Sequence, residues 1–284
     1  MGAITGQGQS FNLPNYVGEL FNISPTDTPL LSAIGGMTGG ISVTSKQFTW
    51  QTTDLAGAAQ TAVVEGANPV MKGRTRSEVT NVTQIMQYGV EVSYSKQAAV
   101  GNTAGESIIG NQPVQDELAF QLDMTVKGAA IDIEHSFIQG AYNAGANITT
   151  PRKTRGMLAA ISTNEVAGGA AALTQAKVES ALKKMADAGA PFEMPVIFAN
   201  AFQKQKLSSI YSSALALAPR DRNIGGVNIT TIETDFGEVG IVYERHIPAD
   251  DVLIADLAFL KPVFLDIPGK GHFFVEPVAQ SGAA

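Results

Sequence analysis

The clearest pattern along the chain is an alternation of apolar and polar residues over residues 78–94, which predicts a long β-strand. One face carries Val82, Met86, Tyr88, Val90, Val92 and Tyr94, and the other carries Thr83, Gln87, Glu91 and Ser93. A shorter alternating stretch, residues 46–53, predicts the partner arm of a hairpin. At about 3.3 Å per residue the longer arm would extend roughly 55 Å, more than a compact domain of this size covers. We therefore expect the hairpin to lean on a neighbouring subunit.

Residues 54–77, between the two predicted arms, are rich in glycine and alanine and contain the turn-forming pair Asn68-Pro69. Three basic residues, Lys72, Arg74 and Arg76, follow this pair. Such a composition is typical of a loop tip that becomes ordered by contact. Because a plain surface loop is rarely this long, the segment is interpreted as a tongue between subunits.

Apolar residues at three- and four-residue steps predict a helix over residues 113–143, roughly 45 Å long at 1.5 Å per residue. Pro113 suits the first helical turn, and Gly145 suits a stop. Residues 1–42 are instead rich in glycine, asparagine and proline, which indicates an extended arm with one or two helical turns near Pro29.

The second half of the chain mixes helices and strands without a regular βαβ repeat. Helices are predicted at residues 175–188, with Thr174 as N-cap and Gly189 after the end, and through residue 210 behind an Asn200 cap. Strands are predicted at residues 195–199, 227–234, 238–244, 252–257 and 260–267. The fold class expected from this order is α+β.

Composition narrows the classes of function. Charged residues make up 16% of the chain, below the usual quarter, so much of the surface is small or apolar, which suits burial against further copies. The net charge of −7 argues against a dedicated nucleic-acid binder, although DNA can be contained without being gripped. No cysteine is present, and no apolar run approaches the roughly 20 residues that span a bilayer, so neither disulfides nor a membrane are expected.

No catalytic constellation is recognisable. His135, His246 and His272 fall on three different predicted elements, and a lone histidine is more often structural than catalytic. The pair Asp250-Asp251 reads as an exposed turn, because adjacent residues of a strand point to opposite faces. Phosphate-loop, zinc-protease and hydrolase-elbow motifs are missing from the sequence. We predict no catalytic, cofactor-binding or metal-binding residues, and no enzyme.

The order of predicted elements resembles the major capsid proteins of tailed bacteriophages with the Hong Kong 97-type fold. Two local stretches look similar to the actinobacteriophage-like branch of that family. They are Ser24-Pro25-Thr26-Asp27-Thr28-Pro29-Leu30-Leu31 and Thr154-Arg155-Gly156-Met157-Leu158. The resemblance in element order covers nearly the whole chain.

This resemblance implies a division into five segments. An N-terminal arm would take residues 1–42, and an extended hairpin loop residues 43–95. A peripheral domain would occupy residues 96–190 and hold a spine helix at 113–143. An axial domain would follow at residues 191–244, and residues 245–284 would return to the peripheral domain.

The resemblance also implies a function: self-assembly into the icosahedral head shell that encloses the double-stranded DNA genome of a tailed bacteriophage. The partners would be further copies, in hexamers and pentamers, a portal, a separate scaffold or decoration protein, and packaged DNA contacted non-specifically. Assembly would take place in the bacterial host cytoplasm, and the protein would reside in the virion. The alternatives are an encapsulin-like nanocompartment shell, which shares the fold, and a soluble enzyme using His246 or His272.

Overall fold

The computed structural model describes residues 25–53, 57–93, 117–212 and 230–278 of the 284-residue chain. The chain divides into two units, of which the larger holds Thr28–Ile85 and Asp132–Glu276. The mixture of helices and strands confirms the expected mixed α and β class.

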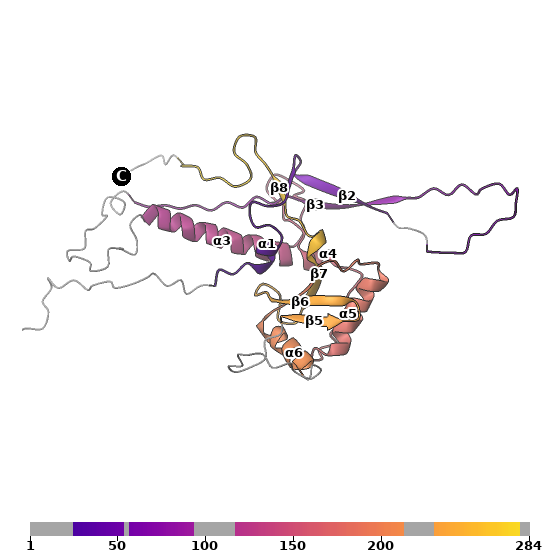
Figure 1. Cartoon of the computed structure of the whole chain (residues 1–284). Helices are drawn as coiled ribbons and strands as arrows, with labels where there is room; N and C mark the ends of the chain where they lie inside the picture. Colours follow the sequence, from indigo (N-terminus) through magenta and orange to yellow (C-terminus); the bar gives the residue numbers. More distant parts are fainter. Residues whose placement is uncertain (1–24, 54–56, 94–116, 213–229, 279–284) are drawn as a thin grey trace, which may run out of the picture. The chain divides into compact units, whose positions relative to one another are not determined.

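A four-stranded sheet forms the centre of the larger unit (Figure 1). Its order is β5 (Thr231–Thr234), β6 (Gly237–Tyr243), β4 (Pro195–Ala199) and β7 (Val252–Asp256). Strand β4 pairs in parallel with β6 and antiparallel with β7, whereas β5 and β6 form a hairpin. The strand predicted at residues 195–199 is confirmed, and the strand predicted at 252–257 is one residue shorter.

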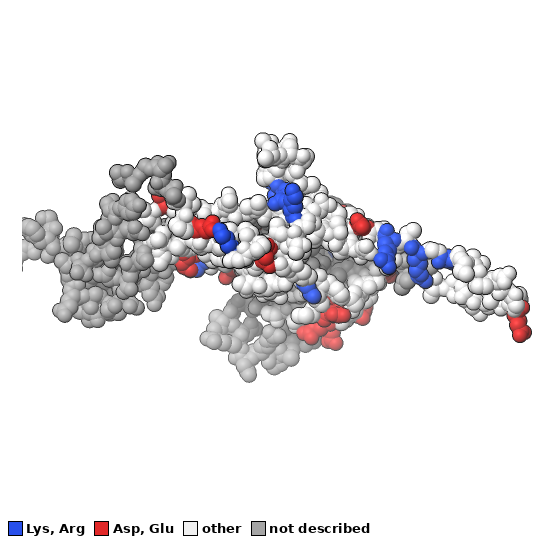
Figure 2. Space-filling view, turned by 90° about the horizontal axis from the view of Figure 1, so that it is seen from above, with Lys and Arg blue, Asp and Glu red and all other residues white. Residues whose placement is uncertain are grey.

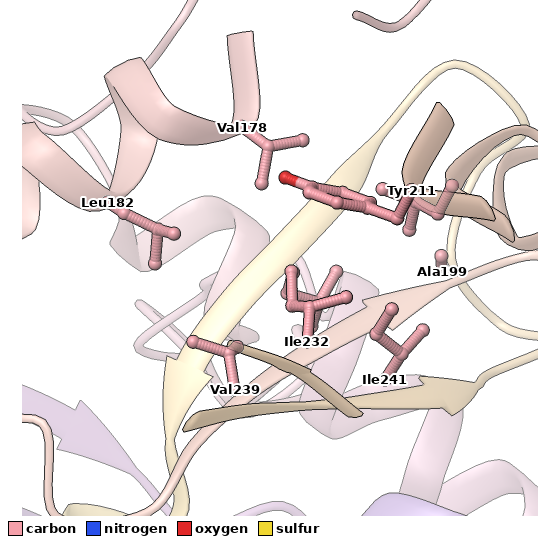
Figure 3. Packing of buried hydrophobic residues seen from close by; sticks show 9 residues of the cluster. Val178, Leu182, Ala199, Tyr211, Ile232, Val239 and Ile241 are labelled. Atoms are coloured by element: carbon pink, nitrogen blue, oxygen red, sulfur yellow. The ribbon is translucent and has the colours of Figure 1, made fainter. Parts of the chain in front are cut away.

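Strand β4 is covered on both faces, which explains its unbroken apolar sequence. Ile197 and Ala199 point into a cluster that also takes residues from helices α5 (Gln175–Asp187) and α6 (Ala201–Ser212). Figure 3 shows this cluster from close by, with Val178, Leu182, Ala199, Tyr211, Ile232, Val239 and Ile241 labelled. Phe198, the residue between, points into a second cluster with Leu30, Ile138, Ile247 and Leu253.

The caps predicted for α5 and α6 are found at the expected positions. Thr174 is the N-cap residue of α5, although its side chain makes no capping hydrogen bond, and Gly189 follows the helix with a φ of +84°. At α6 the Asn200 side chain accepts a hydrogen bond from the backbone N–H of Gln203 at 2.9 Å. The Gln203 side chain does not close a capping box, because it donates to the carbonyl of Ala249 instead.

Helix α3 (Glu117–Gln139) corresponds to the long helix predicted at residues 113–143. Residues 113–116 lie outside the described part of the chain, and the predicted end at Asn143 is wrong. The helix stops at Gln139 because the chain at Gly140 crosses the backbone of residues 154–156. Gly156 donates its backbone N–H to the Gly140 carbonyl at 2.8 Å, which replaces a further helical hydrogen bond.

Strands β2 (Gln47–Thr53) and β3 (Arg76–Val82) form the predicted hairpin, in antiparallel register from Gln47 opposite Val82 to Thr53 opposite Arg76. The prediction of one strand over residues 78–94 is wrong, because β3 ends at Val82 and residues 83–93 form no strand. Tyr94 lies outside the described residues. The ladder stops because the first arm leaves at Lys46 toward β1 (Ile41–Val43), which pairs in parallel with β8 (Val263–Leu265).

The remaining described elements are short: α1 (Pro29–Ala33), α4 (Met157–Ala160) and the 3₁₀ turn η1 (Leu257–Phe259). Helix α1 confirms the short helix predicted near Pro29, with Thr28 in the N-cap position but without a side-chain hydrogen bond. The first 24 residues of the predicted arm lie outside the described part of the chain. The strand predicted at residues 260–267 is reduced to β8.

Candidate assembly surface

The hairpin β2–β3 belongs to the larger unit, and Asn81 at its base fixes it to the segment around Arg155. The Asn81 side-chain oxygen accepts from the backbone N–H of Arg155 at 2.9 Å, and its nitrogen donates to the Arg155 carbonyl at 3.3 Å. Gln84 adds a hydrogen bond from the backbone N–H of Thr154 at 3.2 Å. The neighbouring Val82 side chain is buried. The base of the hairpin is therefore held rigidly, through paired polar groups and one apolar contact.

Beyond its base the hairpin continues as a long extended loop (Figure 1). Val63, Val64, Val70 and Met71 leave 80–90% of their surface exposed. A subunit stable by itself rarely exposes so many large apolar side chains on one segment. The loop therefore carries an apolar tip, defined here as these four residues, that is available for contact.

Basic side chains gather on the same hairpin (Figure 2). Lys72, Arg74 and Arg76 are exposed and alternate along the returning arm. Alternate residues of an extended chain point to the same side, so the three cations form one row. Arg76 donates a hydrogen bond to the Gln51 side chain at 3.1 Å. No salt bridge within the described residues neutralises this row.

A buried pair of carboxyl groups lies where α1, α3 and the end of β6 meet. Glu134 of α3 and Glu244 after β6 are both fully buried, and the Glu244 carboxyl lies close enough to Glu134 to raise its pKa. Glu134 caps α1, since its two oxygens accept from the backbone N–H groups of Leu30 at 3.1 Å and Leu31 at 3.3 Å. Burial and the Glu244 carboxyl raise the pKa of Glu134 from 4.5 to about 8, against the lowering effect of these two N–H groups.

The two carboxyl oxygens of Glu244 differ in their hydrogen bonding. Its Oε1 accepts from the backbone N–H of His246 at 2.9 Å, whereas Oε2 finds no N–H or hydroxyl donor among the described residues. Neither glutamate was predicted to be a functional residue, because a single Glu inside a helix or after a strand is usually a solvated charge. The one available signal was that Glu134 lies between apolar residues of the helical stripe, Ile133 and Phe137.

A second polar cluster joins the segment before β1 to the segment after β8. His272 places Nδ1 2.8 Å from Asp266 and Nε2 2.8 Å from the carbonyl oxygen of Met37, and Ser42 donates to Asp266. Partial burial lowers the pKa of His272, but the Met37 carbonyl and the Asp266 carboxylate outweigh it and raise that pKa above 6.5. The hydrogen bond from Ser42 and then the contact with His272 lower the pKa of Asp266.

The other groups considered from the sequence make no recognisable active centre. His135 and His246, predicted to be scattered, lie in edge-to-face contact with ring centroids 6.0 Å apart. His272 belongs to the separate cluster described above. Asp250 and Asp251 are exposed in a turn, as predicted. Within the described ranges no grouping of three His, Cys, Asp or Glu side chains suits a metal ion, and no described helix is both long and apolar enough to cross a membrane.

Comparisons with known proteins identify the kind of protein to which this fold belongs. Residues 3–284 match the profile of the family described as SU10 major capsid protein. A chain of the solved capsid asymmetric unit of cyanophage A-1(L) is similar, with a TM-score of 0.61 at 15% identity over 91% of this chain and 78% of that chain. A chain of the cyanophage P-SCSP1u capsid matches with a TM-score of 0.45 at 14% identity, over 87% of this chain and 72% of that chain. No curated protein matches.

The fold and the family match together define a shell-forming protein of phage particles. The chain belongs to the SU10 major capsid protein family, and it is a phage major capsid protein. A capsid protein assembles with further copies of itself and resides in the virion. The predicted capsid function is confirmed, and it is preferred to the encapsulin-like alternative. The family also points to a structural rather than an enzymatic role.

Proposed function

We propose that this capsid protein forms an icosahedral shell of the Hong Kong 97 type by laying its β2–β3 hairpin over a neighbouring subunit. The observation that carries the proposal is the apolar tip, Val63, Val64, Val70 and Met71, held out on an anchored hairpin. A capsid subunit has further copies of itself as its abundant partner. The tip and the rest of the hairpin are therefore the surface through which one copy reaches the next.

The energetic case rests on the burial of the apolar tip. Covering four exposed side chains of this size would contribute on the order of 6–12 kcal/mol before the cost of ordering the loop. Several such contacts per subunit reinforce one another in a closed shell, because each additional contact is made without further loss of free translation. Individually modest contacts between hairpins and neighbours thus suffice for a stable particle.

The distribution of charge also favours a second copy of the chain as the partner of the hairpin. The row Lys72, Arg74 and Arg76 is cationic, whereas the whole chain carries a net charge of −7. A second copy therefore presents an acidic surface on average, and like-charged rows would repel each other. The cationic row favours docking against the acidic body of a neighbour over pairing with another hairpin.

The five-segment division implied by the resemblance is retained as part of the proposal. Residues 43–95 form the extended loop, α3 is the spine helix of the peripheral domain, and residues 191–244 form the axial domain near the centres of hexamers and pentamers. Strand β7, which pairs with β4, adds to the same sheet from beyond residue 244. Membership of the actinobacteriophage-like branch rests only on the local stretches around Pro29 and Gly156.

A phage shell of this type implies the further partners of the protein and the place where it assembles. The particle would enclose double-stranded DNA, meet a portal at one vertex, and use a separate scaffold or decoration protein, with assembly in the bacterial host cytoplasm. The acidic net charge suits a wall that contains DNA without binding it tightly.

Electron microscopy of the purified chain, with two matched double variants, tests the proposal. Val64→Asp with Met71→Asp places charges on the tip, whereas Val64→Leu with Met71→Leu keeps it apolar. We expect closed shells for the wild type and the leucine variant, and capsomers or single subunits for the aspartate variant. All three should unfold at the same urea concentration, because both positions are exposed. Shells of normal yield from the aspartate variant would overturn the proposed role of the tip.

A further inference from the structure

We propose that Glu134 and Glu244 share one proton, and that this proton fastens helix α1 to α3 and to the end of β6, so that raising the pH loosens α1. The shared proton acts within the folded subunit, independently of how subunits meet. The buried pair of carboxyl groups thus has a regulatory role in addition to the structural role of the capsid protein.

The contacts around the pair require a proton. Two ionised carboxylates are acceptors only, so the buried carboxyls of Glu134 and Glu244 can hydrogen-bond to each other only when one of them is protonated. The buried Oε2 atom of Glu244 has no donor among the described residues. A protonated Glu134 carboxyl, which lies beside it, supplies one. At the same time the two oxygens of Glu134 hold the N–H groups of Leu30 and Leu31. One shared proton therefore lets Glu134 of α3 hold both α1 and the end of β6 at once.

No described cation replaces the proton. Helix α1 contains no titratable side chain, and the apolar cluster beneath it consists of Leu30, Ile138, Phe198, Ile247 and Leu253. Arg245 follows Glu244 in the chain, but it is exposed and its guanidinium lies over the Tyr243 ring at 5.9 Å.

The two nearby histidines contribute backbone contacts instead of a counter-ion. His246 donates its backbone N–H to Glu244 and accepts from the Gln139 side chain through its carbonyl. Its ring lies edge to face with that of His135. A salt bridge to Glu134 or Glu244 is not found within the described residues.

Opening this junction exposes Glu134 to water and releases the proton. In the closed state the pKa of Glu134 is about 8, whereas an exposed glutamate titrates near 4.5. The proton favours the closed state fully below pH 4.5, and its contribution is lost as the pH rises through about 8. The equilibrium constant for opening therefore rises about tenfold per pH unit within this window and levels off above it.

Hydrogen exchange of the Leu30 and Leu31 amides in the unassembled full-length subunit tests the proposal. After correction for the intrinsic rate, protection of these amides should fall about tenfold per pH unit between pH 5 and pH 8. The decisive variant is Glu244→Gln, because its amide nitrogen can donate to an ionised Glu134 while its oxygen still accepts from His246. Protection in this variant should be nearly constant over the same range.

Two further variants complete the experiment. Glu193→Gln changes an exposed carboxylate elsewhere and should keep the wild-type slope. Glu134→Gln should also lose the slope, but with lower protection throughout, because its nitrogen cannot accept from Leu31. A flat profile in the wild type, or a wild-type slope retained in Glu244→Gln, would overturn the shared proton. Because no assembly is measured, neither result bears on the role of the hairpin.

Discussion

Gly128 within α3 and Gly140 just after its end should respond to alanine in opposite directions. Gly140 lies at the crossing that ends α3, where an added Cβ would meet the Thr154 carbonyl oxygen at 2.6 Å and the Gly156 nitrogen at 3.2 Å. Both are backbone atoms, so no flexible side chain can move aside. Gly128, in the middle of the same helix, has nothing within 4 Å of an added Cβ.

The expected magnitudes follow from these surroundings. Gly140→Ala forces the two backbone segments apart and weakens the hydrogen bond from Gly156 to the Gly140 carbonyl, which together should cost about 2–4 kcal/mol of the free energy of unfolding. Gly128→Ala removes backbone freedom from the unfolded chain without a clash and should add about 0.5–1 kcal/mol.

Urea denaturation of the unassembled subunit measures both effects on the same scale. The unfolding midpoint should fall for Gly140→Ala and rise for Gly128→Ala, with the denaturant slope unchanged. If Gly140→Ala were as stable as the wild type, the close crossing of residues 140 and 154–156 would not exist in the protein. A loss at Gly128 comparable with that at Gly140 would instead show that any change in this helix is harmful.

Three further predictions concern other contacts. Asn81→Ala should cost about 1–3 kcal/mol and speed amide exchange at Arg155, because it leaves both backbone groups of that residue without their partner; unchanged exchange would show that this anchor is dispensable. Leu182→Ala should cost about 2–5 kcal/mol in urea denaturation, since the side chain is fully buried, whereas the exposed neighbour Lys183→Ala should change it by less than about 0.5 kcal/mol. The raised pKa of His272 means that its contribution is complete below pH 6.5 and is lost as the pH rises through the raised value, so exchange in β1 and β8 should accelerate there, and a pH step that persists in His272→Gln would refute this origin.

Patterns within a few neighbouring residues, such as helix caps and short apolar runs, predicted the elements that depend on them. The caps at Asn200 and Gly189 depend on neighbours one to three positions away, so the start of α6 and the end of α5 could be predicted from the sequence. The end of α6, predicted at Ile210, lies at Ser212. The apolar run Pro195–Ala199 predicted a buried strand, because only a strand covered on both faces avoids polar residues. The alternation around Trp50 likewise predicted β2.

Contacts between distant residues decided the features that the sequence analysis missed. The alternation of apolar and polar residues beyond Val82 indicates that one face of this segment is covered, but it does not show which chain covers it. Among the described strands, β3 pairs only with β2. The end of α3 depends on the approach of Thr154 to Gly140, not on the more obvious Gly145. The helical periodicity predicted α3 but not the residue at which it ends.

The order of predicted elements was enough to show a resemblance to phage capsid proteins, because that order extends over nearly the whole chain. The place where the buried carboxyl groups meet depends instead on how distant segments pack together. Glu134 and Glu244 are separated by more than a hundred residues, and Leu30 is as far from Glu134 on the other side. The pKa of a carboxyl group depends on burial and on the charges that folding places beside it, and neither is encoded in the residues next to it in the chain.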